Sequence, residues 1–155
     1  MKVLRFFSRR RAVSLDKRFL RRLVRSLLED CLDHQDYQLG VHFIGATEMA
    51  RLNETFLGHA GSTDVITFDY QEHADKGQLY GEIFISIDDA LIYASRFRAH
   101  WQSEVTRYLV HSVLHLKGFD DTTPAARRAM KRRENRLLKQ LSAGFDLAKM
   151  DRTCH

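Results

Sequence analysis

The sequence predicts an α/β (α+β) fold: one domain in which a small β-sheet of about four strands packs with about five helices. The chain has 155 residues, 44% of them hydrophobic, and a chain of this size can bury one sizeable core. Short apolar runs of strand type alternate with longer segments of helical periodicity. Only one Pro and eight Gly are present, and no Gly/Ser/Pro-rich tract divides the chain. Residues 1–155 are therefore expected to form a single domain.

The first third of the chain predicts a strand, a helix and a second strand. Residues 2–7 have the β-branched and aromatic content of a short strand. Ser14 is the expected N-cap of a helix that runs to about Asp33, because apolar residues recur there every three or four positions. Residues 39–43 alternate between apolar and polar side chains, which predicts a strand that ends at Gly45.

A short helix is expected next. Thr47 is its predicted N-cap, and Met49, Leu52 and Phe56 are its predicted inward side. Gly58 is expected to end it, because only glycine adopts the left-handed conformation without a Cβ penalty.

Two core strands follow, separated by a polar loop at residues 71–78. Residues 63–68 are expected to enter the core from a polar mouth, where Asp64 lies. Taken alone, Asp64 is better explained by turn chemistry, since its side chain can bind nearby backbone amides. Residues 81–87 form the other strand, and the glycine at its start would allow another element to approach closely.

Helices dominate the rest of the chain. Asp88 is the predicted N-cap of a helix to about Ala99, with Phe97 among its inward residues. Thr123 and Pro124 make a good N-cap and first residue for a last helix. The expected buried face of that last helix consists of Ala126, Met130, Leu137 and Leu141.

The stretch between these helices carries the most specific chemistry. Val105, Tyr108, Leu109, Val113 and Leu116 form one apolar helical stripe. His111 and His115 are one turn apart on a neighbouring face, so both imidazoles can point at a single ion. Gly118 lies where the helix would stop, and the reversed chain can then bring back Asp120 or Asp121. Two nitrogens and one carboxylate leave a coordination position open, as catalytic zinc requires.

A simpler interpretation of the two histidines is a hydrogen-bonded surface pair, which is common for this spacing. The glycine and the acidic pair after it favour metal binding. The helical peptidase motif His-Glu-x-x-His has a general base after the first histidine, and here Ser112 takes that position, which argues against a peptidase.

Two further carboxylates have open roles. Glu134 lies on the buried face of the last helix, where it either pairs with an arginine or orients a metal-bound histidine. Glu82 could orient a ligand or simply occupy the edge of a strand.

The charge distribution suggests a polyanionic partner without proving one. The net charge is +5 and the pI about 9.4. Ten Lys/Arg lie between Lys2 and Arg25, and seven lie between Arg127 and Lys139. Such clusters suit a phosphate backbone, but they are also typical of the solvated faces of amphipathic helices.

Targeting and redox signals are weak. The start of the chain lacks the long apolar segment of a secretion signal, and no apolar stretch reaches membrane length. Cys31 falls on a helical stripe and is expected in the core, while Cys154 is next to the terminus, so no disulfide framework is expected. These observations favour a reducing cytoplasm and no membrane partner.

Several motifs in this order resemble the YbeY family of bacterial endoribonucleases, the rRNA maturation factors. They are Leu52-Asn53 followed by Phe56, the strand Thr63-Asp64-Val65-Ile66-Thr67-Phe68, Gly81-Glu82-Ile83, the run from His111 to Asp120, and Met130 with Glu134. The resemblance extends from about Leu39 to Leu141. It implies a single α/β domain with helices packed on a small mixed sheet. It also implies a metal site at the mouth of a basic cleft with one ion, usually zinc, and the ligands His111, His115 and Asp121.

Three positions differ from the family's usual residues. The third ligand is commonly histidine, and here Asp121 occupies that position. An arginine that is a candidate for contacting the scissile phosphate is often found where this chain has Leu57. Arg107, one turn before His111, is the substitute that we expect to act in its place. Ser62 replaces a common proline.

The leading hypothesis is a metal-dependent endoribonuclease, specific for single strands, that acts in small-subunit (16S) rRNA maturation and ribosome quality control. Its expected partners are rRNA and the small ribosomal subunit. The candidate catalytic residues are Arg107, Asp64 and Glu82. Two other classes remain open: a ribosome-associated RNA-binding factor with a structural metal or none, and a metallohydrolase of another substrate. The sequence sets no oligomeric state.

Overall fold

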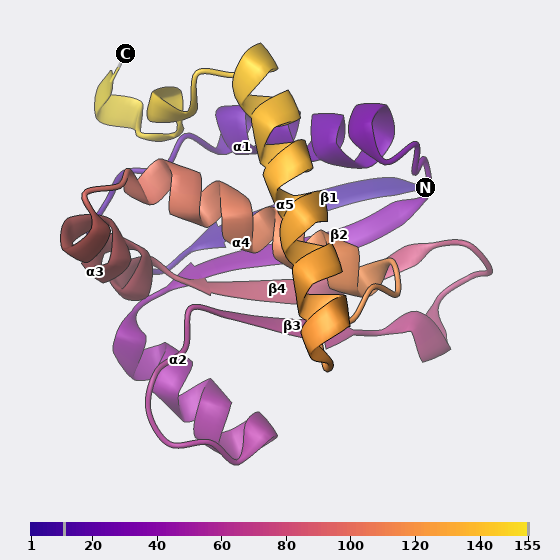
Figure 1. The fold of residues 1–155 in the computed structure, drawn as a ribbon, viewed down its shortest axis with the longest axis horizontal. Coiled ribbons are helices and arrows are strands. Elements are labelled where there is room, and N and C mark those ends of the chain that lie inside the picture. Colours follow the sequence, from indigo (N-terminus) through magenta and orange to yellow (C-terminus); the bar gives the residue numbers. More distant parts are fainter. Residues whose placement is uncertain (11, 155) are drawn as a thin grey trace.

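A four-stranded mixed sheet runs through the centre of the molecule (Figure 1). The computed structural model describes residues 1–10 and 12–154. In sheet order the strands are β1 (Lys2–Ser8), β2 (Tyr37–Ile44), β4 (Leu79–Ser86) and β3 (Val65–Asp69). β1, β2 and β4 are parallel, and β3 runs antiparallel to β4.

Five α-helices connect and cover the strands. They are α1 (Lys17–Arg25), α2 (Ala46–Leu52), α3 (Ile87–Phe97), α4 (Trp101–Leu116) and α5 (Pro124–Gly144). π-Helical segments prolong α1 (Ser26–Cys31) and α2 (Asn53–Leu57). Single 3₁₀ turns occur at Gln71–His73, Leu147–Met150 and Arg152–Cys154. The predicted fold class, a single domain with a small mixed sheet and about five helices, is confirmed.

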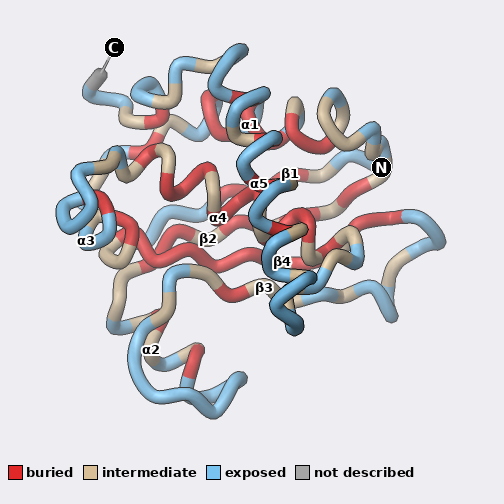
Figure 2. The backbone as a smooth tube through the Cα atoms, viewed as in Figure 1, coloured by how far each residue is buried: buried red, intermediate tan, exposed pale blue. Residues whose placement is uncertain are grey.

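The helices are unequally distributed over the two faces of the sheet. α1 and α4 pack on one face, and α5 crosses the outer side of α4, so the sheet, α4 and α5 form successive layers (Figure 1). The main core lies between the sheet and these helices, as the red segments in Figure 2 show. α2 covers only part of the opposite face, over a small second core of Ile44, Met49, Ile66 and Phe84.

Close packing of α4 on β4 depends on one glycine. A Cβ at Gly81 would fall 2.8 Å from Cδ2 of Leu116 and would also collide with the backbone carbonyl oxygen of Phe68. The close approach that the sequence predicted at this glycine is therefore present. Because side chains alternate along a strand, Glu82 points to the opposite face, away from α4.

The first helix begins later than predicted. Its N-cap is Asp16 and not Ser14, since Asp16 Oδ1 accepts from the amides of Arg18 and Phe19 at 3.0 and 3.1 Å. Ser14 lies before the helix, and its carbonyl accepts from the amide of Arg152 at 2.8 Å. That partner is too far along the chain for a local pattern to indicate it.

The predicted N-caps of α2 (Thr47) and α3 (Asp88) are also wrong, because the carboxylate of Asp88 serves α2 and not α3. Asp88 does not cap its own helix, because Ser86 does so through its hydroxyl. Asp88 instead accepts from the amide of Ala46 at 2.7 Å and so supplies the N-terminal hydrogen bond of α2. α2 therefore begins after Gly45 and needs no cap from Thr47.

Some expected inward residues lie at the surface. Phe56 and Phe97 are 61% and 60% exposed, in contrast to the prediction. Phe56 falls in the π-helical segment, whose wider turn shifts side chains out of the α-helical stripe. Cys31 is half-buried at the edge of the core, and the side chain of Cys154 lies outside the described part of the chain.

Other local predictions are confirmed. Gly58 ends the helical segment with a φ of 68°. Thr123 caps α5 through its hydroxyl, which accepts from the amide of Ala126 at 3.0 Å. The buried residues of α5 include Met130, Leu137 and Leu141, whereas Ala126 is half-buried. Across the described residues, no helix combines the length and apolar character needed to cross a membrane.

Candidate metal centre

The end of α4 shapes the candidate site. The amide of Gly118 donates to the carbonyl of His115 at 2.9 Å, and the amide of Phe119 donates to the carbonyl of Leu114 at 3.1 Å. This pair of bonds is the Schellman motif, and it requires the positive φ of 101° at Gly118. The motif reverses the chain directly after the helix, so the loop returns beside the histidines that have just passed.

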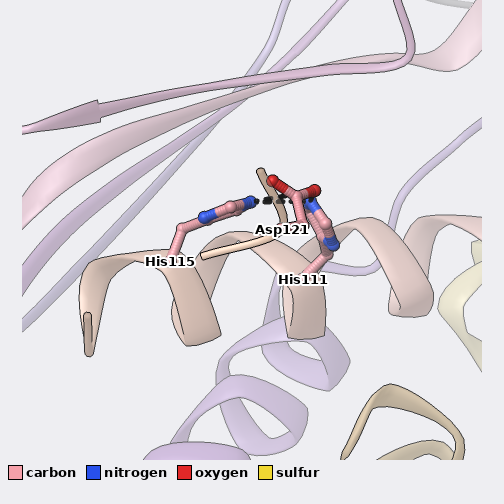
Figure 3. A group of neighbouring side chains, drawn as sticks. All are labelled: His111, His115 and Asp121. Atoms are coloured by element: carbon pink, nitrogen blue, oxygen red, sulfur yellow. Dashed lines mark hydrogen bonds and ion pairs between the residues drawn. The ribbon is translucent and has the colours of Figure 1, made fainter. Parts of the chain in front are cut away.

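His111, His115 and Asp121 converge at this point (Figure 3). The Nε2 atoms of the two histidines are 2.9 Å apart, and each lies 3.6 Å from Oδ2 of Asp121. A triangle with these sides has a centre about 2.0 Å from each corner, which is the usual length of a zinc bond to nitrogen or oxygen. The three atoms are therefore close enough together for one ion to contact all of them.

Asp121, and not Asp120, lies with the histidines. The carboxylate of Asp120 is instead directed at the next turn, where Oδ1 is 3.5 Å from the amide and the hydroxyl of Thr122. The sequence left these two aspartates open, because both follow the same glycine.

Glu134 of α5 holds His111 from behind. Its Oε2 is 2.6 Å from Nδ1 of His111, and its Oε1 is 3.3 Å from Nη1 of Arg107. The same Nη1 is 3.1 Å from Oδ1 of Asn135. The sequence offered an arginine pair or a histidine-orienting role as alternatives for Glu134, and the structure shows both contacts at once.

The contact between His111 and Glu134 selects the metal-binding form of the imidazole. When Nδ1 carries the hydrogen that Glu134 accepts, the lone pair of Nε2 is free to face the ion. This hydrogen bond raises the pKa of His111, against the effect of burial. Burial raises the pKa of Glu134, but its bonds and charge interactions with His111 and Arg107 outweigh that effect, so the pKa is lowered.

The three candidate catalytic residues lie in different positions relative to His111 and His115. Asp64 is exposed at the start of β3, and its negative charge helps to raise the pKa of His111, so it lies within electrostatic reach of the site. Arg107 is tied to Glu134, as described above. Glu82 is not brought to the metal centre: it lies across the sheet, 3.6 Å from Nε2 of His42 and 3.5 Å from the hydroxyl of Tyr70.

A cavity of about 410 Å³ opens beside the two histidines. Its remaining lining residues are Leu57, Val65, Ile66, Thr67, Asp69 and Leu116. Leu57 is thus a wall residue of the site, although the sequence marked it only by the absence of an arginine. Asp69 was missed altogether, because it follows the predicted strand and belongs to no motif.

The position after His111 makes no contribution to this cavity. Ser112 is fully buried in the core, and its hydroxyl has no hydrogen-bond partner among the residues that the structure describes. Ser112 therefore cannot act as the general base that a helical peptidase has at this position.

Comparisons with known proteins point the same way. The family model described as "Endoribonuclease YbeY" matches residues 6–142. Endoribonuclease YbeY of Chlorobium phaeovibrioides is 40% identical over 102 residues, which are 66% of this chain and 67% of that protein. Endoribonuclease YbeY of Chlorobium luteolum is 35% identical over 127 residues, 82% of this chain and 90% of that protein. The solution structure of a Thermotoga maritima protein shares the fold, with a TM-score of 0.67 and 22% identity over 92% of this chain and 91% of that one.

Proposed function

Because the chain belongs to the YbeY family of endoribonucleases, we propose that it is a metal-dependent enzyme that cuts single-stranded RNA in the maturation of small-subunit (16S) rRNA and in ribosome quality control. The observation that carries the metal dependence is the convergence of His111, His115 and Asp121 on one point beside a cavity. Its partners in this proposal are rRNA and the small ribosomal subunit, and its location is the cytoplasm.

The proposed cofactor is one zinc ion, held by His111, His115 and Asp121. Two imidazole nitrogens and one carboxylate oxygen form a donor set that zinc enzymes use with a fourth position open. A bound ion of this kind would polarise the scissile phosphate or lower the pKa of a coordinated water.

Side chains of the protein would orient the metal ligand His111 and neutralise nearby charge. Glu134 fixes the ring of His111, and Arg107 neutralises the buried carboxylate of Glu134 at 3.3 Å. Arg107 also places a positive charge one turn before His111, where it would favour a bound phosphate. Asp64 is kept as a candidate for contacting the substrate at the start of β3, where its Oδ1 accepts from the amide of Val65 at 2.8 Å. Glu82 has no part in this proposal.

The cavity offers room for substrate beside His111 and His115. Its volume of about 410 Å³ lies within the range of small-ligand sites, so it could take a nucleotide of a strand. The apolar wall at Leu57 and Val65 would contact a base or sugar, while the phosphate would face the histidines. This division supports the proposed preference for single strands.

The test compares His115→Ala with His100→Ala. His100 is exposed at the other end of α4, about 16 Å along the helix from His111, so it is a matched control on the same element. Wild-type protein and His100→Ala are expected to hold about one zinc ion and to cut a single-stranded rRNA precursor segment. His115→Ala is expected to lose both properties.

Two results would contradict the proposal. Cleavage at the wild-type rate by folded His115→Ala would remove the metal centre from the reaction. A zinc-loaded wild type that binds RNA but cuts nothing, together with RNA binding by His115→Ala, would favour an RNA-binding factor with a structural metal.

A further inference from the structure

The outer face of α5 carries an unusual concentration of positive charge. Its seven basic residues are Arg127, Arg128, Lys131, Arg132, Arg133, Arg136 and Lys139. All but Arg133 are exposed. The helix has one acidic residue, Glu134, and it is buried against His111. α5 lies outermost over α4, and most of its length is exposed in Figure 2.

These cations lack close acidic partners, and Lys131 interacts with Glu104 only at longer range. Throughout residues 1–10 and 12–154, no carboxylate lies within 4.0 Å of the nitrogens of any basic side chain of α5. Arg127 donates to the backbone carbonyl of Asp121 at 3.5 Å, and Arg133 lies over the ring of Phe119 at 4.3 Å. Neither contact neutralises a charge.

The other basic cluster of the sequence differs in this respect. Several of its members are engaged in ion pairs, namely Lys2 and Arg25 with Glu29, Arg9 with Glu48, and Arg10 with Asp88. Arg21 donates to the carbonyl of Leu4 at 2.8 Å. The two clusters looked alike in the sequence but differ in the structure: four N-terminal cations form ion pairs and Arg21 bonds a backbone carbonyl, whereas no cation of α5 forms an ion pair among the described residues.

The arrangement on α5 is unfavourable for the helix itself. Three like-charged pairs stand at i,i+4 spacing, Arg127 with Lys131, Arg128 with Arg132, and Arg132 with Arg136. Arg127 and Arg128 also lie in the first turns, where the helix dipole disfavours positive charge. A polyanion bound along the helix would relieve this repulsion.

The cationic face is continuous with the metal centre. Arg127 touches the backbone of the ligand Asp121, and Glu134 from the same helix holds the ligand His111. From Arg127 to Lys139 the helix extends about 18 Å, which matches about five phosphates of one strand in helical geometry. A strand cut at the metal centre could therefore continue along α5.

We propose that the exposed cationic face of α5 is an RNA track that binds the phosphate backbone of the substrate strand on one side of the metal centre. The track rests on the proposed endoribonuclease function and adds an extended binding site to it. It positions the strand and makes no contact with the reacting atoms. Because its contacts are ionic, it contributes affinity without sequence preference and weakens as salt rises.

The test neutralises one stripe of the track. Arg128, Arg132 and Arg136 follow one another at four-residue spacing on the exposed side, away from the contacts to Asp121 and His111. The variant R128Q/R132Q/R136Q removes their charges, and glutamine is a comparable helix former, so the fold should be retained. R128K/R132K/R136K replaces the same three side chains but keeps their charges, so it shows whether a loss of RNA affinity comes from the charge or from the change of side chain.

The matched control is R5Q/K17Q/R18Q. It lowers the net charge by the same three units, and its residues are exposed, with no carboxylate within 4.0 Å among the described residues. It therefore separates a local track from a general effect of net charge.

Binding is measured by fluorescence anisotropy with zinc-loaded protein and labelled 2′-O-methyl oligouridines of about 4 and about 16 nucleotides, over a range of salt. For the longer strand we expect the slope of log Kd against log salt to fall by about 2 in the glutamine variant. That change corresponds to about 100-fold weaker binding near 0.1 M salt. The loss should be smaller for the short strand, and the lysine variant and the control should match the wild type.

The track would be refuted if the glutamine variant kept the wild-type salt slope. It would also be refuted if the control variant lost as much RNA affinity as the glutamine variant. Cleavage is a separate readout. If the protein binds RNA through α5 but never cuts it, the track is supported and the endoribonuclease proposal is refuted. If the wild type cuts RNA but the glutamine variant keeps the wild-type salt slope, the endoribonuclease proposal is supported and the track is refuted.

Discussion

Replacement of Glu134 with Gln keeps the shape of the side chain but removes one of two acceptor oxygens. In the wild type Oε2 accepts from Nδ1 of His111 at 2.6 Å, and Oε1 accepts from Arg107 at 3.3 Å. Glutamine has one acceptor oxygen and one NH₂ group, so it cannot accept from both donors. Either Arg107 loses its partner, or the amide donates to Nδ1 of His111.

The second arrangement would harm metal binding directly. If Nδ1 accepts a hydrogen bond, the ring proton of neutral His111 moves to Nε2, the atom that faces His115 and Asp121. Loss of such an orienting partner typically lowers metal affinity 10- to 100-fold, or about 1.4–2.7 kcal/mol. We also expect the metal-free protein to lose about 1–3 kcal/mol of stability, because a buried hydrogen bond to a charged group is lost.

The assay is a zinc competition titration against a chromophoric chelator, with urea unfolding of the metal-free protein beside it. Asn135→Ala is the matched control, since Asn135 also contacts Nη1 of Arg107 but has no contact with His111. It should bind zinc as the wild type does. Zinc affinity of Glu134→Gln within about threefold of the wild type would refute the role of Glu134 in orienting the ligand.

Three further predictions concern backbone and ion-pair sites. Gly81→Ala should destabilise the protein by about 3 kcal/mol in urea unfolding, because the new Cβ meets a backbone oxygen of β3 that no rotamer change can move. A loss below about 1 kcal/mol would show that the backbone of β3 shifts to make room for the methyl group. Gly118→Ala, at a φ of 101°, should cost about 1–2 kcal/mol and weaken zinc binding, and unchanged affinity would mean that the loop returns without this glycine. Hydrogen bonds from Lys2 and Tyr37 lower the pKa of Glu29 to about 2 from an ordinary value near 4.5, so this residue stabilises the fold above pH 4.5 and the contribution is lost as the pH falls toward 2. Glu29→Gln should therefore flatten the stability profile in that pH window, and an unchanged acid profile would contradict the assignment.

The convergence of His111, His115 and Asp121 could be predicted from the sequence because its determinants are local. His111, His115, Gly118 and Asp121 lie within eleven consecutive residues, and helix spacing with one glycine conformation fixes how they meet. Glu134 is different, since it comes from another helix. The sequence could place it on a buried face but could not show that its two oxygens serve two partners.

The failures have a common physical origin in partners far along the chain. The start of α2 depends on Asp88, which is 42 residues away from Ala46 in sequence. Glu82 was a candidate for catalysis because of its motif, yet the packing of Gly81 against α4 turns its side chain to the other face. The exposure of Phe56 follows from a π-helical turn that no local pattern indicated.

Two of the three departures of this chain from the usual residues of the family, Asp121 and Leu57, have a common electrostatic direction. A carboxylate at Asp121, in place of a neutral imidazole, lowers the charge of a zinc-loaded site from +2 to about +1. Leu57, in place of an arginine, removes a second positive charge from the cavity wall. Both changes weaken the attraction for a phosphate at the point of cleavage. The unpaired cations of α5, one of which touches the backbone of Asp121, restore positive potential just outside the cavity. If the proposed metal centre and RNA track are correct, attraction for the strand would lie less on the reacting phosphate and more on its neighbours. Substrate affinity in this protein should then depend more on strand length and salt than in relatives that keep both residues.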